Sequence, residues 1–583
     1  ERFSLNHYDP SRTTEPNYGW RGIRVPLVIT ITLVLLVHLL GVVCFEVIDD
    51  IGAIMILSGA DGFPSSAEVP FISTTFNHLI FNLYHWYPEI SWYGWFLVTT
   101  TAVASTVLIC VVTQLPITKP TKGALLLFTL LVLTQCLLSP TYTKSALLSL
   151  FASFVVLLQS QSAQTSKVSG KSLIAILYWL SYFWRWKVTL IFTVFAFPVL
   201  LIASNRQLQR LTILLAVIAG PIILDQLWSS SLETDSTRQF MEFYELRSRF
   251  FDRPGGAASE SSSIAASKVG WHPDDYQVIR STFLLHDEKR VSTESLRQFL
   301  DENAKVKSDA FSTSLQRAVA ALGENKAILL LAIVMGFLVA AERLPDFIKS
   351  STREKSKSTC VLLGLAGIIG FLFYFRMVPR IAVPIAMYTV LVITVFPIGQ
   401  RQSTKGSAVQ QLLAAAACLL VLFIGVRWIT EINQANNTRR EHSDIMHDEF
   451  NSVSSASVLI RLTPQSTPGF DGASPLVGLP QTKAKLVPAG WQIRSTRYQD
   501  ILSQLGFDSG REMLSKWNDK SQLFFITGSK DHRLTVADAW LAYLIRHDLV
   551  ASDVIITTMA ESETGGGWAL FRFCTPLAVM DPP

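Results

Sequence analysis

The sequence VPLVITITLVLLVHLLGVVCFEVIDDIGAIMILSGADGFP, residues 25–64, passes from a long apolar run to two adjacent acids. Residues 25–46 are long enough to cross a bilayer, because a membrane helix needs about 20 mostly apolar residues. Asp49 and Asp50 follow, and no Lys or Arg lies between residues 46 and 91. The stretch therefore predicts a membrane span followed by an acidic loop at the membrane surface.

The composition supports the same interpretation for the whole chain. Of 583 residues, 49% are hydrophobic and 16% are charged, and the mean hydropathy is +0.34. An average soluble domain carries about 25% charged residues. We therefore predict an α-helical polytopic membrane protein. The formal net charge of +5 is typical of basic loops between spans, so we expect no nucleic-acid partner.

Apolar runs recur along the chain and predict about eleven transmembrane helices. The run at 172–183 is the shortest of them. The predicted spans are 25–46, 92–113, 123–138, 145–159, 172–183, 187–203, 211–227, 327–341, 359–375, 381–398 and 409–429.

The loops between these spans differ in charge. Basic residues gather in alternate loops, from Arg21 and Arg24 before the first span to Arg401 and Lys405 before the last. Cytoplasmic loops of membrane proteins carry such an excess of Lys and Arg. We therefore expect the N-terminus to be cytoplasmic and the C-terminus to be extracytoplasmic.

This topology divides the chain into three domains. Residues 1–24 form a cytoplasmic tail, 25–429 a multi-span transmembrane domain, and 430–583 a small extracytoplasmic α/β domain. The transmembrane domain includes an outer loop, 46–91, with an interfacial helix, and an outer helical segment, 228–326. In the last domain, the runs QLFFITG, DVIITTM and WALFRF predict strands, and residues 497–505 and 535–547 predict helices.

The outer loop contains a helical apolar stripe and several polar and aromatic side chains. The stripe consists of Ile72, Phe76, Leu79, Leu83 and Tyr87, and its spacing indicates a helix in the membrane interface. Aromatic residues after it are typical of an interfacial belt, with sugar stacking as the alternative. The substrate-binding candidates of this region, each with a structural or interfacial alternative, are Glu68, His78, His85, Trp92 and Tyr93.

Basic residues at the outer ends of spans break the charge pattern. They are Lys144 in SPTYTKSA, Arg185 and Lys187 in FWRWK, and Arg376 and Arg380 in FRMVPR. Taken singly, each of these residues could instead anchor its span to lipid headgroups. Together, around a vestibule that also contains acids, they favour a bound phosphate or pyrophosphate, because guanidinium groups match phosphate oxygens.

Acids beside such a phosphate site suit glycosyl transfer from a polyprenyl-phosphate carrier. An aspartate can take the proton of an acceptor hydroxyl as the new bond forms. Asp49 and Asp50 are the candidates, with a polar stop to the span or a helix cap as the alternative. Asp61, among glycines and a proline, is typical of a turn. The acids Asp274, Asp275, Asp287 and Glu288 are expected to cap or solvate surface helices.

The order of these features resembles the C-class (GT-C) integral-membrane glycosyltransferases. The stretches that carry the resemblance are DDIGAIMILSGADGFP, SPTYTKSALLSL, FYELRSRFFDRPG, WHPDDYQVIRSTFLLHDE and VPAGWQIRSTRYQDILSQLGF, which are also similar to a bacterial group of polysaccharide-associated membrane proteins. The resemblance implies that an aspartate of the first outer loop, Asp49 or Asp50, is the catalytic base. It also implies a bacterial cytoplasmic membrane. No second acidic pair completes a divalent-metal site, so a divalent cation stays open.

We therefore expect a glycosyltransferase that moves a sugar from a polyprenyl-phosphate-linked donor to an extracytoplasmic glycan or glycolipid acceptor. Its partners are the lipid-linked donor, the acceptor and membrane lipids, and no cofactor is assigned. One rival is a transporter or flippase for a lipid-linked saccharide, although strong charges at one face favour the enzyme over it. Another rival is a non-catalytic subunit of an envelope assembly with the same architecture.

Overall fold

The computed structural model describes most of the chain. The described residues are 20–160, 168–203, 208–232, 234–252, 260–282, 286–306, 325–349, 378–395, 408–452, 458–461, 470, 472–479, 484–488, 490–516, 523–527, 533–561 and 569–574. The predicted span 359–375 and the candidate Arg376 lie outside them.

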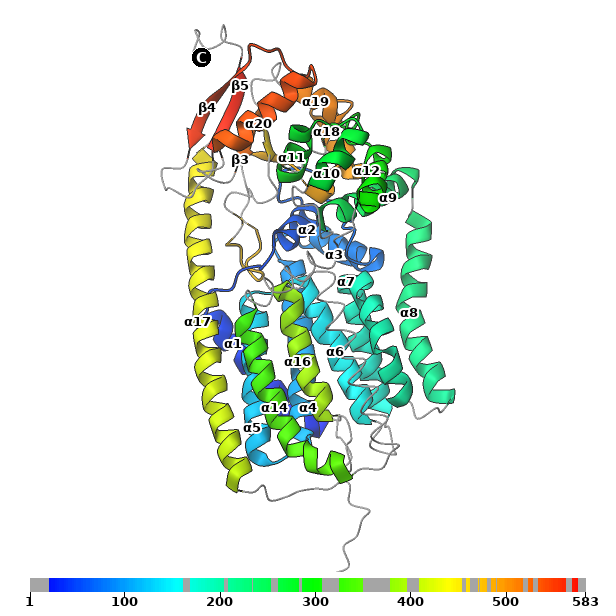
Figure 1. The fold of residues 1–583 in the computed structure, drawn as a ribbon, viewed down its shortest axis with the longest axis vertical. Coiled ribbons are helices and arrows are strands. Elements are labelled where there is room, and N and C mark those ends of the chain that lie inside the picture. The colour runs from blue at the N-terminus through cyan, green and yellow to red at the C-terminus, as the bar shows by residue number, and fades with distance from the viewer. Residues whose placement is uncertain are drawn as a thin grey trace, which may run out of the picture.

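Long apolar helices form an elongated bundle, which is the lower part of the molecule in Figure 1. Six helices of the described residues are long and apolar enough to cross a membrane, which makes the chain an α-helical polytopic membrane protein as predicted. The count of eleven stays a prediction. The bundle helices are α1 (Trp20–Leu40), α4 (Trp92–Gln114), α5 (Lys119–Leu138), α6 (Tyr142–Ser160), α7 (Val168–Ala203), α8 (Leu208–Leu232), α14 (Lys326–Lys349), α16 (Pro379–Val395) and α17 (Ala408–Ser452).

Helix α7 is a hairpin of two helices rather than one long helix. Arg185 has non-helical dihedral angles, with φ −154° and ψ 69°. The Tyr178 hydroxyl lies 3.2 Å from the Thr193 hydroxyl, and Ser181 lies 2.7 Å from Thr189. A straight helix would separate Tyr178 and Thr193 by about 22 Å. The two halves therefore run antiparallel, as the separate spans 172–183 and 187–203 predict.

Burial separates central from peripheral helices. The apolar window of α6 is 94% buried, whereas those of α1 and α8 are 17% and 11% buried. An apolar helix with this little burial within the protein needs another apolar environment. We therefore expect α1 and α8 to face lipid, with α6 at the centre of the bundle.

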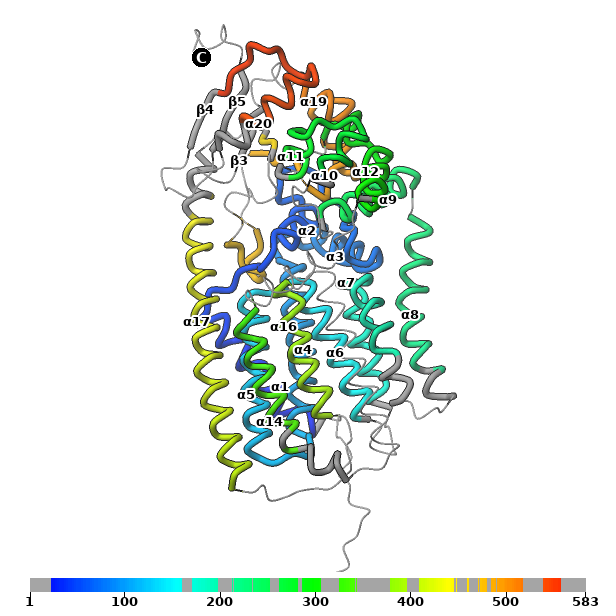
Figure 2. The backbone as a smooth tube through the Cα atoms, viewed as in Figure 1, coloured from blue at the N-terminus to red at the C-terminus, as the bar shows by residue number. Residues whose placement is uncertain are grey.

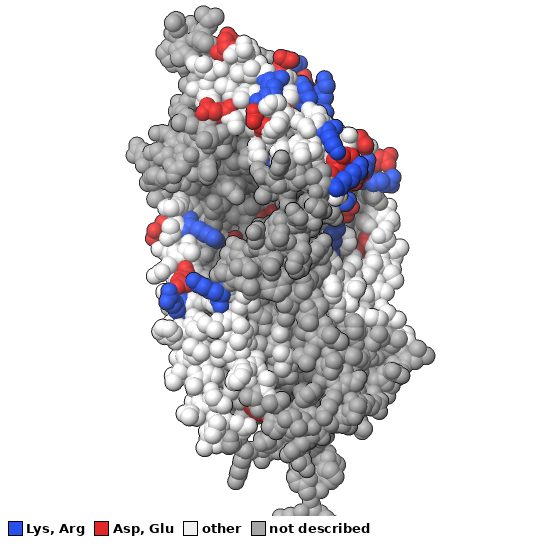
Figure 3. Space-filling view, viewed as in Figure 1, with Lys and Arg blue, Asp and Glu red and all other residues white. Residues whose placement is uncertain are grey.

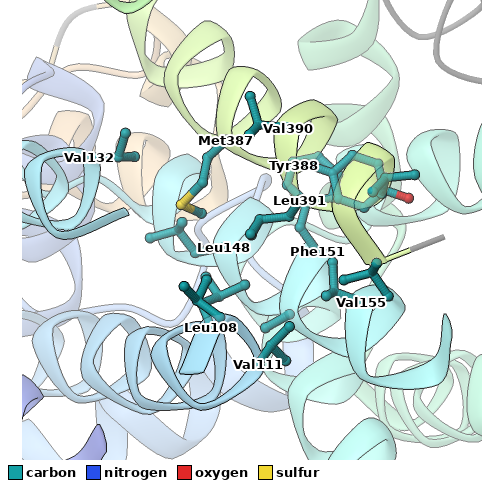
Figure 4. Close-up of a cluster of buried hydrophobic side chains, with 14 of the residues drawn as sticks. Leu108, Val111, Val132, Leu148, Phe151, Val155, Met387, Tyr388, Val390 and Leu391 are labelled. Atoms are coloured by element: carbon teal, nitrogen blue, oxygen red, sulfur yellow. The ribbon is translucent and has the colours of Figure 1, made fainter. Parts of the chain in front are cut away.

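The core of the bundle is packed from α4, α5, α6 and α16 (Figure 4). Phe151 of α6 stacks on Tyr388 of α16, with the ring centroids 4.2 Å apart. Close packing of this kind holds membrane helices together, because lipid provides no hydrophobic force between them. The side chains around this pair include Leu108, Val111, Val132, Leu148, Val155, Met387, Val390 and Leu391.

The first loop, residues 41–91, begins earlier than the apolar pattern predicts. Helix α1 ends at Leu40, and the predicted end at residue 46 is wrong. The chain leaves the helix because Val42 N–H donates to the Asn433 side chain at 2.7 Å and Phe45 N–H donates to the Ala473 carbonyl at 3.3 Å. Contacts with the end of the chain thus replace a last helical turn, and the loop continues into α2 (Ile48–Ser58) and α3 (Thr74–Trp86).

Helix α3 is present as predicted, and one row of its residues is buried within the protein. Phe76, Ile80 and Tyr84 are buried in one row, whereas Leu79 and Tyr87 of the predicted stripe are 46% and 58% exposed. The buried row follows from ring contacts, since Phe76 packs edge-on against Trp184 at 4.9 Å. The helix thus packs on the tip of α7 and leaves its other side for the membrane surface.

Above the bundle lie short helices and a mixed sheet (Figures 1 and 2). The sheet has the order β2-β1-β3-β5-β4, in which β1 is parallel to β2 and β3, and β5 is antiparallel to β3 and β4. The helices are α9 (Asp235–Asp252), α10 (Glu260–Lys268), α11 (Pro273–Thr282), α12 (Thr293–Val306), η1 (Gly490–Gln492), α18 (Thr496–Gln504), α19 (Gly510–Lys516) and α20 (Arg533–Arg546), and the strands are β1 (Val458–Arg461), β2 (Lys485–Val487), β3 (Leu523–Thr527), β4 (Ile555–Glu561) and β5 (Ala569–Cys574). The three strand-like runs of the sequence form β3, β4 and β5.

Helix α17 joins the bundle to this upper part. Its 45 residues extend about 67 Å, more than twice the roughly 30 Å thickness of a hydrocarbon core. It runs without a break through residue 430, where the predicted last domain begins. On the face drawn in Figure 3, charged side chains lie mainly on the upper half of the molecule, and few lie on the part of the bundle that is not grey. This distribution is typical of a bundle set in lipid below a solvated head.

Buried ion pairs hold α9–α12 to the last domain. Asp287 is fully buried and accepts two hydrogen bonds from Arg511, both at 2.8 Å, and one from the Tyr543 hydroxyl at 2.9 Å. Asp275 is likewise buried, with Arg546 and His547 as partners. The prediction that these acids cap helices holds in part, because Asp275 accepts from the His272 N–H and Asp287 from the Arg290 N–H, each at 3.3 Å. Their burial and their side-chain partners more than 200 residues away were not predicted.

Glu288 is a helix cap, but of a distant helix. Its carboxylate accepts hydrogen bonds from the backbone N–H groups of Gly510 at 2.8 Å and Arg511 at 3.0 Å, in the first turn of α19. The first N–H groups of a helix have no partner within it, so an external acid stabilises them.

Candidate active site

Asp49 and Asp50 lie in the first turn of α2, at the end of the bundle that α2 and α3 cover. We call this end the capped end. The residue before the helix is Val47, with φ −131° and ψ 147°, and no side chain caps α2. Acids in a first turn are stabilised by the helix dipole. The capping alternative therefore does not hold for α2 itself, and both carboxylates point to other parts of the chain.

Asp50 is fully buried and binds two segments of the bundle. Its Oδ1 atom accepts a hydrogen bond from the Tyr93 hydroxyl at 2.7 Å and one from the Tyr142 backbone N–H at 3.1 Å. Tyr142 opens α6, so Asp50 satisfies a first-turn N–H of that helix. The Asp50 Oδ2 atom has no hydrogen-bond partner among the described residues. A proton bound to this oxygen would remove the negative charge of the buried carboxylate.

Burial raises the pKa of Asp50 to about 8. The hydrogen bonds from Tyr93 and Tyr142 oppose this shift, and the neighbouring charge of Asp49 adds to it. Desolvation thus outweighs the charge repulsion expected for two adjacent acids. At neutral pH, the buried Asp50 side chain is therefore mainly protonated.

Asp49 faces Arg380 from α16. The Arg380 Nη1 atom lies 4.0 Å from Asp49 Oδ2, and the side chains are 24% and 30% exposed. This distance exceeds hydrogen-bond length, so the pair is held by charge alone. The structure therefore brings together an acid and a cation that are more than 300 residues apart in the sequence, as the charge pattern predicts.

Arg185 lies at the tip of the α7 hairpin and reaches the same group of residues. Its Nη1 atom donates to the Tyr142 hydroxyl at 2.7 Å, and its guanidinium carbon lies 4.8 Å from the centre of that ring. Phe71 stacks on Tyr142 at 4.6 Å and also lies beside Arg185. Tyr142 thus connects Arg185 to Asp50, through its hydroxyl on one side and its backbone N–H on the other.

The two candidate lysines have carboxylate partners. Lys144 is buried, pairs with Glu46 and donates to the Ser139 carbonyl at 2.7 Å. Lys187 pairs with Glu245 of α9 at 2.7 Å, and both side chains are more than one-third exposed. Glu46 and Glu245 carry no pattern in the sequence that distinguishes them from other acids.

The substrate-binding candidates separate in the structure. Tyr93 is part of the Asp50 group, whereas Trp92, the first residue of α4, donates to the Tyr87 carbonyl at 3.0 Å. His78 packs beside Trp228, where burial lowers its pKa, and His85 is exposed. Glu68 lies in the wall of a separate cavity, described below.

The site also contains Phe71 and Trp491, two aromatic residues that carry no recognisable signal in the sequence. Trp491, in η1, packs against Phe71 with ring centroids 5.0 Å apart. A Cβ atom added at Gly52 would lie 3.3 Å from the Trp491 ring and 3.1 Å from Gln492. The last domain therefore packs directly on α2, within one turn of Asp49 and Asp50.

Asp61 is in a turn, as predicted, and also in an ion pair. Its Oδ1 atom accepts from Phe63 N–H at 3.3 Å and from Arg497 Nη2 at 2.5 Å. Both side chains of the pair are at least 95% buried. Burial raises the pKa of Asp61 and Arg497 opposes that shift.

The described residues contain no group of three or more His, Cys, Asp or Glu side chains that could hold a metal ion. Metal dependence therefore stays open. Arg380 lies beside Asp49, and the Tyr93 hydroxyl and the Tyr142 N–H bind Asp50.

No family model and no curated protein sequence matches the chain. Among solved structures, it is similar to ArnT from Cupriavidus metallidurans in the apo state, with a TM-score of 0.38 and 11% identity over 94% of this chain and 98% of that one. The same protein bound to undecaprenyl phosphate gives 0.37 and 10%, over 94% and 97%. Similarity at this level carries no conclusion on activity, so the function is inferred below from the site.

Proposed function

We propose that the protein is a membrane glycosyltransferase that moves a sugar from a polyprenyl-phosphate-linked donor to a glycan or glycolipid acceptor. The observation that supports this most is the loose Asp49–Arg380 pair at the capped end. It combines an accessible carboxylate with an accessible guanidinium at a membrane surface. These are the two charges that removal of a proton and departure of a phosphate require.

Asp49 is the general base in this proposal. A base must reach the hydroxyl that it deprotonates, and the Asp49 side chain is 30% exposed whereas that of Asp50 is fully buried. A base must also be ionised, and Asp50, with a pKa of about 8, is mainly protonated at neutral pH. Asp50 then acts as a positioning residue that holds α2 to α4 and α6.

Arg380 and Arg185 bind the donor phosphate. The Arg380 guanidinium lies 4.0 Å from Asp49 and is partly exposed, so a phosphate can approach it. Arg185 binds the hydroxyl of Tyr142, whose backbone N–H binds Asp50. Lys144 and Lys187 hold Glu46 and Glu245, and in this proposal they shape the site without touching the phosphate.

The transfer step uses these residues as follows. The acceptor oxygen bonds to the anomeric carbon of the sugar, and its proton passes to the Asp49 carboxylate. The bond between the anomeric carbon and the phosphate oxygen breaks, and polyprenyl phosphate leaves with the bonding electrons. Its growing negative charge is stabilised by Arg380, which favours the transition state over the bound donor.

The orientation follows from the charge pattern. With the N-terminus in the cytoplasm, the capped end and the last domain lie outside the cytoplasmic membrane. The donor sugar and the acceptor then meet on the extracytoplasmic face. Cysteine labelling of the last domain in intact cells tests this orientation.

The experiment that tests the function is a transfer assay with the purified protein in vesicles that contain a radiolabelled polyprenyl-phosphate sugar. We expect label to pass to the acceptor in the wild type, and Asp49→Asn to slow it by at least 100-fold. The control is Glu89→Gln, an exposed acid of the same loop. Full transfer by Asp49→Asn contradicts the mechanism, and uncleaved donor that crosses the bilayer supports the transporter instead.

A further inference from the structure

A polar cavity lies between the first loop and α18, apart from the Asp49–Arg380 pair. Its volume is about 350 Å³, within the roughly 300–1,000 Å³ range of small-molecule sites. The residues of its lining that carry the inference are Ser65, Ser66 and Glu68 from the loop and Asp500, Ser503 and Gln504 from α18. The proposed mechanism uses none of these residues.

The lining suits a ligand with many hydroxyl groups. Serine hydroxyls both donate and accept hydrogen bonds, carboxylates accept, and the Gln504 amide does both. The one guanidinium in the wall, Arg497, already pairs with Asp61. An anionic ligand would therefore meet Glu68 and Asp500 without a free positive charge, and like charges repel.

Two buried polar atoms of lining residues have no hydrogen-bond partner among the described residues. They are Arg497 Nη1, on a side chain that is 95% buried, and Thr496 Oγ1. Buried polar groups in proteins are nearly always hydrogen-bonded. Both atoms are buried behind the lining, so an occupant of the cavity would meet the serine hydroxyls, Gln504 and the two carboxylates instead.

The cavity lies near the candidate active site. The Ser66 backbone N–H donates to the Ile56 carbonyl at 2.8 Å, which places the cavity rim beside the second half of α2. Along the axis of α2, Ile56 lies about 9 Å from Asp50. A ligand that reaches from the cavity to Asp49 must be longer than that distance, which suits a chain of sugar units.

We propose that this cavity binds an uncharged sugar unit of the acceptor, remote from the hydroxyl that reacts. The inference rests on the proposed function for the identity of the ligand as an acceptor. It deepens that function, because it makes the acceptor a glycan of at least two units rather than a single sugar. The first loop and the last domain then select the acceptor, while Asp49 of α2 and the arginines of the bundle carry out the chemistry.

The test is binding of the purified, detergent-solubilised protein to an array of neutral and acidic oligosaccharides. We expect binding to neutral oligosaccharides, reduced at least tenfold by Ser503→Trp, which fills the cavity from an exposed position of α18. Ser515→Trp, at an exposed position of α19 outside the cavity, is the matched control. Asp500→Ala is the milder second variant, with an expected loss of about threefold and little risk to folding.

The outcomes separate this inference from the proposed function. Glu89→Gln must bind oligosaccharides as the wild type does, because this exposed acid belongs neither to the cavity wall nor to the Asp49–Arg380 pair. Absence of binding, preference for acidic oligosaccharides, or equal binding by Ser503→Trp overturns the inference while the transfer assay stands. Binding that Ser503→Trp removes, in a wild type that transfers no sugar, leaves the cavity in place and overturns the proposed function.

Discussion

The first loop contains two aspartate–arginine contacts that differ in every physical respect. Asp61 and Arg497 lie 2.5 Å apart and are almost fully buried, whereas Asp49 and Arg380 lie 4.0 Å apart and are each about one-quarter exposed. A tight buried pair leaves neither group available to a substrate. A loose exposed pair contributes little stability and keeps both charges accessible. The comparison indicates that the first pair holds the fold and the second performs chemistry.

The largest expected effect on stability comes from breaking the tight pair. Arg497→Met leaves the Asp61 carboxyl buried without its cation, which costs about 3–5 kcal/mol of unfolding free energy. Thermal or denaturant unfolding of the solubilised protein measures this loss. The matched change Arg380→Met should cost less than about 1 kcal/mol. Equal losses in the two variants would contradict the distinction between the pairs.

The next effect concerns activity at the loose pair. Arg380→Gln removes a charge that stabilises the departing phosphate and should lower kcat/KM for the donor about 100-fold, with unfolding unchanged. Arg427→Gln, which removes an exposed arginine of α17 that pairs with Glu431, is the control. A normal transfer rate in Arg380→Gln would exclude this residue from the phosphate site.

A smaller effect, specific to Asp50, is the dependence of thermal stability on pH. Burial raises the pKa of Asp50 from 3.8 to about 8, so its protonated form stabilises the fold fully below pH 3.8. That contribution is lost as the pH rises towards 8. Asp50→Asn keeps an oxygen for the Tyr93 and Tyr142 donors and cannot ionise. Its melting temperature should therefore fall less than that of the wild type between pH 5 and pH 9, and identical slopes would contradict the buried, protonated state.

The smallest effect tests the role of Lys187. Its pair with Glu245 is exposed and is worth less than about 1 kcal/mol. If the lysine only holds α9, Lys187→Met and Glu245→Gln change the donor KM equally little. A rise in donor KM that occurs only in Lys187→Met would show that this lysine binds the donor phosphate. A transfer assay at varied donor concentration distinguishes the two results.

Much of the fold follows from the sequence because a long apolar run has few solutions in a bilayer. The predicted break between 183 and 187 is the Arg185 tip of α7, where a charged and aromatic stretch interrupts two apolar runs. The charge pattern also predicts that Arg380 and the loop acids meet. Apolar runs therefore predict the spans, and basic residues at the outer ends of spans indicate the position of the site.

The partners of the buried acids do not follow from the sequence. Asp50 meets the Tyr142 N–H and Asp287 meets Arg511 through packing of segments that are 92 and 224 residues apart. Nothing near Asp287 distinguishes it from a surface acid, and so its burial was not predictable. The side of α3 that packs on protein does not follow from its apolar stripe, because the contact of Phe76 with Trp184 of α7 decides which side is buried.

The central claim is that the loose pair performs chemistry while the tight pair maintains structure. The most direct test compares Asp49→Asn with Asp61→Asn, with sugar transfer measured per folded molecule and unfolding measured in the same samples. The account predicts that Asp49→Asn loses at least 100-fold in transfer with an unchanged melting temperature, and that Asp61→Asn lowers the melting temperature while the folded fraction stays active. Full transfer by folded Asp49→Asn would contradict it.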